Sequence, residues 1–133
     1  MLAALALVGC ASDARPPGYN DALREIRYQR TEHDARYRRL VHRDLRRNFS
    51  RVLKDCRYQA LDTRPATLLF RLGAGGEALE SFRYPPGEFT DCVYQAVAAF
   101  DFPPPPQPNY WFGVFVRDCP LGGGSSECPQ IVP

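Results

Sequence analysis

The sequence predicts an α+β fold in which a small antiparallel three-stranded sheet packs on helices. Two observations carry this prediction. A long stretch with apolar residues at helical spacing is followed by two short β-type runs, and a second helical pattern then precedes a final run of alternating aromatic residues. The 133 residues have room for one domain with a modest core. The apolar fraction of 44% and the charged fraction of 24% exclude global disorder and a multi-span membrane protein.

The amino terminus carries an export pattern. The first nine residues are almost wholly apolar, and Leu7-Val8-Gly9-Cys10 has the form of a lipobox, in which a signal peptidase cuts before a lipidated cysteine. We therefore predict a lipoprotein signal peptide over residues 1–9 and a lipidated tether over residues 10–20. No Lys or Arg precedes the apolar run, so a start codon further upstream stays open. The alternative is a first strand or a buried helix end that contains a cysteine.

The other cysteines agree with export. Without Cys10 the chain keeps four, an even number that an oxidising compartment converts into two bridges. They are Cys56, Cys92, Cys119 and Cys128. Four cysteines permit three pairings, so counting leaves the connectivity open. The alternative is a set of reduced, buried cysteines in a cytosolic protein.

The first helix is predicted to begin after Pro16-Pro17-Gly18, with Asn20 or Asp21 as its cap. It continues as one long helix or as two in line, because no Gly or Pro occurs again before Pro65. Its apolar pattern is weak over residues 27–36 and strong from residue 40. Only the second half is therefore expected to pack on a core.

Charge is distributed unevenly along the chain. Residues 21–60 contain twelve Lys and Arg against six Asp and Glu, whereas residues 61–133 contain four against eight. We predict a basic helical extension over residues 21–39, which would attract anionic lipid or cell-wall polymer through screened Coulomb forces. The alternative is an ordinary solvated helix face. The candidate residues for this anionic-surface contact are Arg24, Arg27, Arg30, Arg36, Arg38 and Arg39.

A β-hairpin and a second helix follow. Residues 66–72 and 77–84 have strand character, and Gly73-Ala74-Gly75-Gly76 between them permits the positive φ angles of a hairpin turn. After Pro85-Pro86-Gly87 apolar residues recur at spacings of three and four, which predicts a helix that ends before the four consecutive prolines at 103–106.

The final strand is predicted over residues 109–118. Its alternation places four apolar residues on one face, which suits a core. These residues are Tyr110, Phe112, Val114 and Val116. The other face still carries Trp111 and Phe115, so it is either covered or a binding surface. Residues 119–133 are predicted to form a Gly-, Ser- and Pro-containing loop and a tail.

Several motifs occur in a defined order over residues 40–118. They are Cys56 with Tyr58, Gly73-Ala74-Gly75-Gly76, Cys92-Val93, Phe100-Asp101-Phe102-Pro103-Pro104 and the aromatic residues 110–116. This ordered set resembles the carboxy-terminal domain of TonB-type proteins, in the cysteine-paired AgmX/PglI-like branch. The resemblance implies a TonB C-terminal-like domain at residues 40–118. It also implies a Cys56–Cys92 bridge, which leaves Cys119 and Cys128 to close the loop at residues 119–133.

The resemblance also implies a function. Such domains contact envelope proteins, and a sheet edge can accept a partner segment as an added strand. The residues expected at that contact are Tyr110, Trp111, Phe112, Val114 and Phe115. We therefore predict a non-catalytic envelope lipoprotein that binds an envelope protein. It is expected on the periplasmic face of the outer membrane, because Ala11 rather than Asp follows Cys10. The alternative is a structural spacer whose Arg-rich helix binds anionic lipid or cell-wall polymer.

The sequence offers little for catalysis. His33 and His42 are the only histidines, and nine residues apart on a helix they lie on opposite faces, so both are expected to be exposed and no metal site is predicted. The glycine-rich stretches match neither a phosphate loop nor a nucleophile elbow. We predict no enzyme, no cofactor and no small-molecule substrate. Nucleic-acid binding is excluded if the protein is exported.

Overall fold

The computed structural model describes residues 14–60, 64–117 and 130–132, and it confirms the α+β class. Cys10, Cys119 and Cys128, with their predicted lipid and disulfide, lie outside the described residues. The helices are α1 (Tyr19–Tyr28), α2 (Glu32–Gln59) and α3 (Glu88–Ala98). The strands are β1 (Ala66–Leu72), β2 (Ala78–Tyr84), β3 (Tyr110–Arg117) and β4 (Gln130–Val132).

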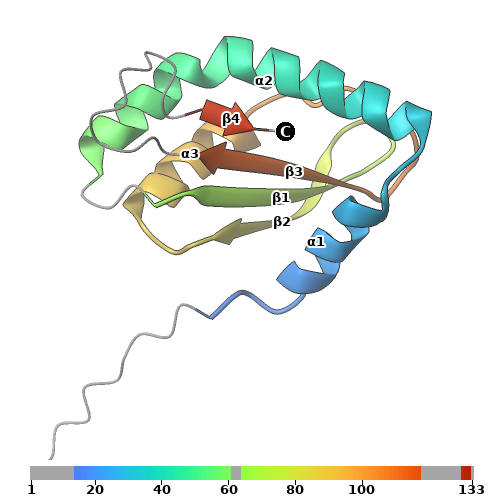
Figure 1. Ribbon diagram of the computed structural model, residues 1–133, viewed down its shortest axis with the longest axis horizontal. Helices are drawn as coiled ribbons and strands as arrows, with labels where there is room; N and C mark the ends of the chain where they lie inside the picture. The colour runs from blue at the N-terminus through green and yellow to red at the C-terminus, as the bar shows by residue number, and fades with distance from the viewer. Residues whose placement is uncertain (1–13, 61–63, 118–129, 133) are drawn as a thin grey trace, which may run out of the picture.

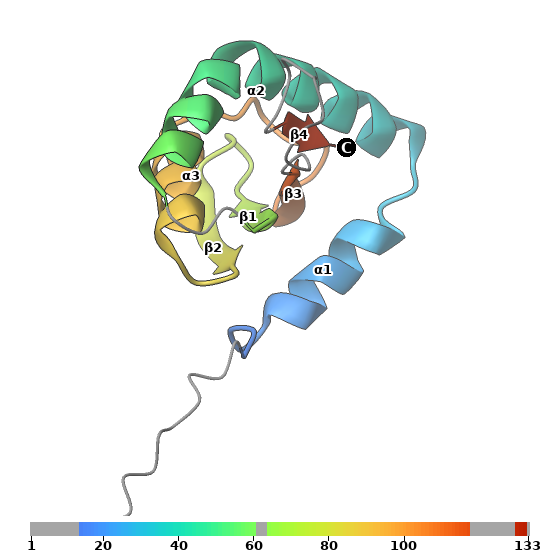
Figure 2. The same ribbon diagram turned by 60° about the vertical axis from the view of Figure 1, so that its left-hand side comes forward.

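The strands form one antiparallel sheet in the order β2-β1-β3-β4, with helices on both faces. α2 runs along the whole sheet on one face, together with α3 (Figure 1). α1 lies against the opposite face, as the turned view shows (Figure 2). The alternation of side chains along β1 and β3 therefore serves two cores, one on each side of the sheet.

The larger core lies between the sheet and the two helices α2 and α3. The apolar face predicted for β3 is buried there, together with the even-numbered residues of β1 and the inner face of α3. The Cys56–Cys92 bridge joins α2 to α3, with an S–S distance of 2.06 Å and a sequence separation of 36. The pairing implied by the resemblance is thus the one that the structure contains.

The predicted three-stranded sheet gains a fourth strand. β4 pairs with the end of β3, where Val116 lies opposite Ile131. Ile131 is fully buried in the larger core. β3 is therefore an inner strand over this stretch, and the three residues of β4 are too few to show a strand pattern in the sequence.

The basic region forms two helices that are not in line (Figure 2). α2 begins with a capping box, in which the Thr31 hydroxyl accepts a hydrogen bond from the Asp34 N–H at 3.1 Å and the Asp34 carboxylate accepts one from the Thr31 N–H at 3.0 Å. This reciprocal cap starts a new helix without any Gly or Pro. α1 in turn begins after Gly18, with no side-chain cap, and so neither Asn20 nor Asp21 has the predicted capping position.

α1 covers the face of the sheet that the sequence left undecided. Its buried residues Tyr19, Ala22 and Ile26 pack with Leu69 of β1, and Trp111 of β3 packs against this group. The ring of Trp111 stacks on Phe82 with the ring centroids 5.7 Å apart. The packed region thus begins well before residue 40, and the segment predicted as an extension supplies one layer of the fold.

Candidate functional site: a cationic groove along α2

The five aromatic and apolar residues predicted to contact a partner lie on β3. Tyr110, Phe112 and Val114 are fully buried in the larger core, which confirms that their face of the strand suits a core, so any contact of these residues with a partner would have to be made by their backbone. Trp111 and Phe115 are partly exposed on the opposite face, where α1 packs on Trp111. The alternation along β3 predicts its two faces correctly, but it does not show that α1 packs on the face that carries Trp111.

The outer edge of β3 is also occupied. β4 pairs with it at residues 115–117, and the side-chain amide of Gln29 donates a hydrogen bond to the Trp111 carbonyl at 2.9 Å. Gln29 lies in the link between α1 and α2, so the turn between the helices fixes this end of the strand. A partner strand has no continuous free edge along β3.

The six arginines predicted for an anionic surface do not form one stripe. Arg24, Arg27 and Arg30 line a hollow beside α1, and Arg36 faces the proline segment at 104–106. Arg38 and Arg39 line a separate groove, on α2. The break between the helices separates the two groups, because it gives α1 and α2 different directions (Figure 2).

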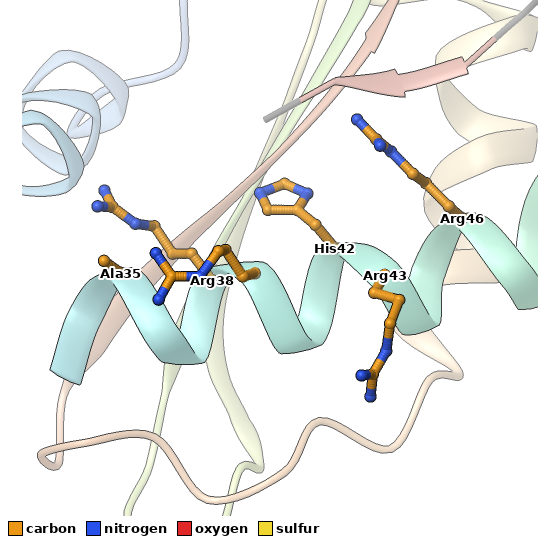
Figure 3. Close-up of a pocket in the computed structure, with 6 residues that line it drawn as sticks. Ala35, Arg38, His42, Arg43 and Arg46 are labelled. Carbon is orange, nitrogen blue, oxygen red and sulfur yellow. The ribbon is translucent and has the colours of Figure 1, made fainter. Parts of the chain in front are cut away.

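The groove along α2 is lined almost entirely by basic side chains and has a volume of about 530 Å³ (Figure 3). Its lining residues are Ala35, Arg38, Arg39, His42, Arg43 and Arg46. Spacings of three and four along a helix place such residues on neighbouring turns of one side. His42 and Arg46 both extend from the upper side of the helix in Figure 3, towards the strands. Arg43, His42 and Arg46 were missing from the predicted surface.

The four arginines of the groove differ in how their charge is compensated. Arg39 lies 3.5 Å from Glu32, and Arg43 lies 3.2 Å from Asp44, in exposed ion pairs. The Arg46 Nε–H donates to the Ile131 carbonyl at 2.9 Å, which orients the guanidinium without neutralising it. Arg38 has no ion pair within the part of the chain that the structure describes. Arg38 and Arg46 therefore carry uncompensated charge.

His42 lies between these two arginines and is only 8% exposed, which contradicts the expectation of a solvent-exposed histidine. Its ring is 5.1 Å from the ring of Phe112, and its Nδ1 is buried with no hydrogen-bond partner among the described residues. Burial, and then the charges of Arg46 and Arg38, lower the pKa of His42 to about 4. The imidazole is therefore neutral at pH 7. In the sequence, His42 stands next to Val41 and three residues before Leu45, at the border of the apolar face of the helix, and this position could have predicted its burial.

Two tyrosines and one carboxylate lie close together near the start of α2. Burial, followed by the nearby charge of Asp34, raises the pKa of Tyr110 to about 12. Burial also raises the pKa of Tyr37 above its ordinary value, and the Tyr37 hydroxyl donates to the Pro103 carbonyl at 2.8 Å. Both phenols thus stay protonated at neutral pH. Asp34 is held in the capping box with Thr31, at the end of α2 nearest to these rings.

The arrangement suits binding of an anion better than chemistry. A catalytic centre needs a nucleophile or a base with a partner that orients it, and the groove offers cationic donors and one neutral imidazole. Within residues 14–60, 64–117 and 130–132, no group of His, Cys, Asp and Glu is arranged to hold a metal ion. His33 is exposed on α2 and does not join His42. None of the described helices has the length and apolarity of a membrane span.

Comparison with known proteins adds no assignment to this geometry. No family model, no curated protein and no solved structure matches the chain.

Proposed function

We propose that this protein is a non-catalytic binding domain of the bacterial cell envelope and that it binds anionic ligands through the groove along α2. The observation that carries the proposal is the composition of the groove, in which four of the six lining residues are arginines. Arginine binds carboxylate and phosphate groups through two parallel hydrogen bonds, so a row of arginines favours anionic surfaces and polymers. This function corresponds to the alternative prediction that an Arg-rich helix binds anionic lipid or cell-wall polymer. The residues proposed for it are those of the groove rather than the six arginines predicted from the sequence.

The envelope location rests on two features of the chain. The lipobox-like Leu7-Val8-Gly9-Cys10 would anchor the mature protein to a membrane, and the Cys56–Cys92 bridge is typical of an oxidising compartment. Near a membrane the groove would meet anionic headgroups or cell-wall polymers at short range. Each arginine at such a surface contributes about 1 kcal/mol of attraction, which salt screens. Ala11 after Cys10 supports the outer membrane as the site of anchoring.

The test is binding to vesicles of phosphatidylcholine with and without phosphatidylglycerol, measured by co-sedimentation at low and high salt. Removing two groove charges with Arg39→Gln and Arg43→Gln should weaken binding by about 2 kcal/mol, or roughly 30-fold. Both residues are exposed, so the fold should tolerate the change. The matched control is Arg24→Gln with Arg27→Gln, which removes the same charge from α1. Equal losses in both pairs would mean that the whole basic surface acts and would contradict a groove-specific site.

Strand addition remains a second candidate, because no other described strand pairs with the outer edge of β2. β2 is the first strand in the sheet order, and its outward residue Leu79 is 49% exposed. The resemblance to TonB-type carboxy-terminal domains supports this mode of binding to an envelope protein. Leu79→Pro would block a partner strand at this edge. We expect it to abolish capture of such a partner from an envelope extract while Leu79→Thr retains capture, provided that both variants keep the wild-type circular dichroism spectrum.

A further inference from the structure

We propose that the groove along α2 is a site for a phosphate group, bound between Arg38 and Arg46 against the ring of His42, and that binding transfers a proton from solvent to that ring. The inference rests on the proposed function, since it names the ligand class of the same groove. It adds His42 as the residue that gives the site its selectivity and its dependence on pH.

The first argument is the placement of charge. Arg38 and Arg46 are one helical turn before and one after His42, which sets their Cα atoms about 6 Å along the axis from that of the histidine on either side. Neither guanidinium has a carboxylate partner within the described residues. The Arg46 side chain is oriented by the Ile131 carbonyl on β4. Two guanidinium groups that have no carboxylate partner among the described residues thus flank one imidazole on neighbouring turns of α2, where both can reach an anion bound against the ring.

The second argument is the histidine itself. It lines the groove, is more than nine-tenths buried, and has a ring nitrogen without a partner among the described residues. A buried polar atom left unpaired is uncommon in native proteins and calls for a physical reason. In the free protein the ring is neutral, because burial disfavours the charged form and protonation would also place a third positive charge next to those of Arg46 and Arg38.

The groups that face His42 decide how a ligand changes this balance. On α2 they are Arg38 and Arg46, with Asp34 one turn further on beside Tyr110. On β3 the uncharged ring of Phe112 lies against His42, and on β4 the Ile131 carbonyl accepts the hydrogen bond from Arg46. A doubly charged anion in the groove would offset both arginines, so the charged form of the ring would become favourable. An imidazolium would then donate a hydrogen bond to the anion.

The donors also select the kind of anion. Two guanidinium groups from positions before and after the histidine, together with one ring N–H, supply more donors than the two coplanar oxygens of a carboxylate can accept, which favours the several oxygens of a tetrahedral phosphate. The volume of about 530 Å³ lies within the range of small-molecule sites, so the phosphate can be carried by a larger molecule. The ligand class is therefore a phosphate monoester or free phosphate.

The expected effect of pH follows from linkage. If the bound anion returns the pKa of His42 from about 4 to its ordinary value, the complex binds a proton that the free protein does not bind. Affinity then increases as pH falls below the ordinary pKa, and the gain is complete below the pKa of the free protein. Between pH 7 and pH 5 the affinity should rise roughly 20-fold.

The experiment titrates the folded protein with sulfate, a tetrahedral dianion whose charge stays constant over this pH interval. Affinity and the ¹⁵N shifts of the His42 ring are measured by NMR at several pH values. We expect the rise in affinity at low pH and an increase in the protonation midpoint of His42 with saturating sulfate. His42→Gln should make the affinity nearly independent of pH, which separates His42 from Asp34. Arg46→Gln should weaken binding roughly tenfold, whereas its neighbour Arg47→Gln should have little effect.

An unchanged His42 midpoint, or the same pH dependence in His42→Gln, would overturn the inference. If His42→Gln fails to fold, the ring titration in the wild type decides alone. Inorganic phosphate and vesicles with phosphatidic acid then identify a soluble or a lipid source, and binding to neither would also overturn the site. If the wild type does not bind sulfate but binds phosphatidylglycerol vesicles through the groove, the phosphate site is wrong and the proposed function stands. If it binds neither, both the phosphate site and the proposed function are wrong.

Discussion

Removal of the Cys56–Cys92 bridge should lower the stability of this domain more than any other single change outside the core. The bridge has a sequence separation of 36 and joins the end of α2 to the middle of α3. In the loop-entropy model, opening a loop of this length costs about 4 kcal/mol. For a domain of this size each kcal/mol corresponds to about 4 °C in Tm, so the expected decrease is about 15 °C.

The assay is thermal unfolding followed by circular dichroism at neutral pH. Cys119→Ala with Cys128→Ala serves as the background, because it prevents a freed thiol from forming a new bridge. Within this background we compare the variant Cys56→Ala with the variant that carries both Cys56→Ala and Cys92→Ala. Both lack the bridge, and the difference between their Tm values gives the packing contribution of the partly buried Cys92 sulfur. If, after this correction, the loss of the bridge lowers the Tm by less than about 5 °C, the reasoning that the bridge acts through the unfolded chain is refuted.

Three further predictions concern the helices. Thr31→Ala should destabilise the protein by about 1 kcal/mol through loss of the capping box, whereas Ser50→Ala on the exposed face of α2 should not, as urea unfolding would reveal. Ile26→Ala should cost about 2 kcal/mol in the same assay, because α1 is a layer of the fold, while Tyr28→Ala at a position 72% exposed should be neutral. The lowered pKa of His42 means that the unfolded state takes up a proton first as pH falls below the ordinary histidine value. Without added anion the wild type should therefore lose about 2 kcal/mol between pH 7 and pH 5, a loss that His42→Leu should not show when urea midpoints are compared.

The elements with a strong local pattern were predictable from the sequence. The spacing of apolar residues placed the second half of α2 and all of α3, and the turn glycines placed the hairpin. Gly76 shows why such a signal is reliable, since its φ of 91° is a turn conformation that favours glycine. These features depend on neighbours in sequence, so the sequence alone contains the necessary information.

The features that depend on distant contacts were not predictable in the same way. Thr31 ends one helix and starts another through a side-chain cap, a change that apolar periodicity does not record. β4 has only three residues and exists because β3 offers it an edge. His42 appears polar in the sequence and is buried because Phe112 and the sheet lie against it. In each case the deciding partner is far away along the chain or outside the periodic pattern.

The position of His42 also bears on whether the groove serves a function or is a by-product of packing. A leucine at the border of the apolar face would bury well against Phe112 and would avoid a neutral imidazole beside two cations. The buried histidine beside these cations therefore lowers stability compared with a simpler solution. Proteins concentrate such locally unfavourable choices at functional sites, where a ligand restores the balance. By the same reasoning the exposed arginines of α1, of which Arg24 pairs with Asp21 at 3.5 Å, are explained by solvation alone.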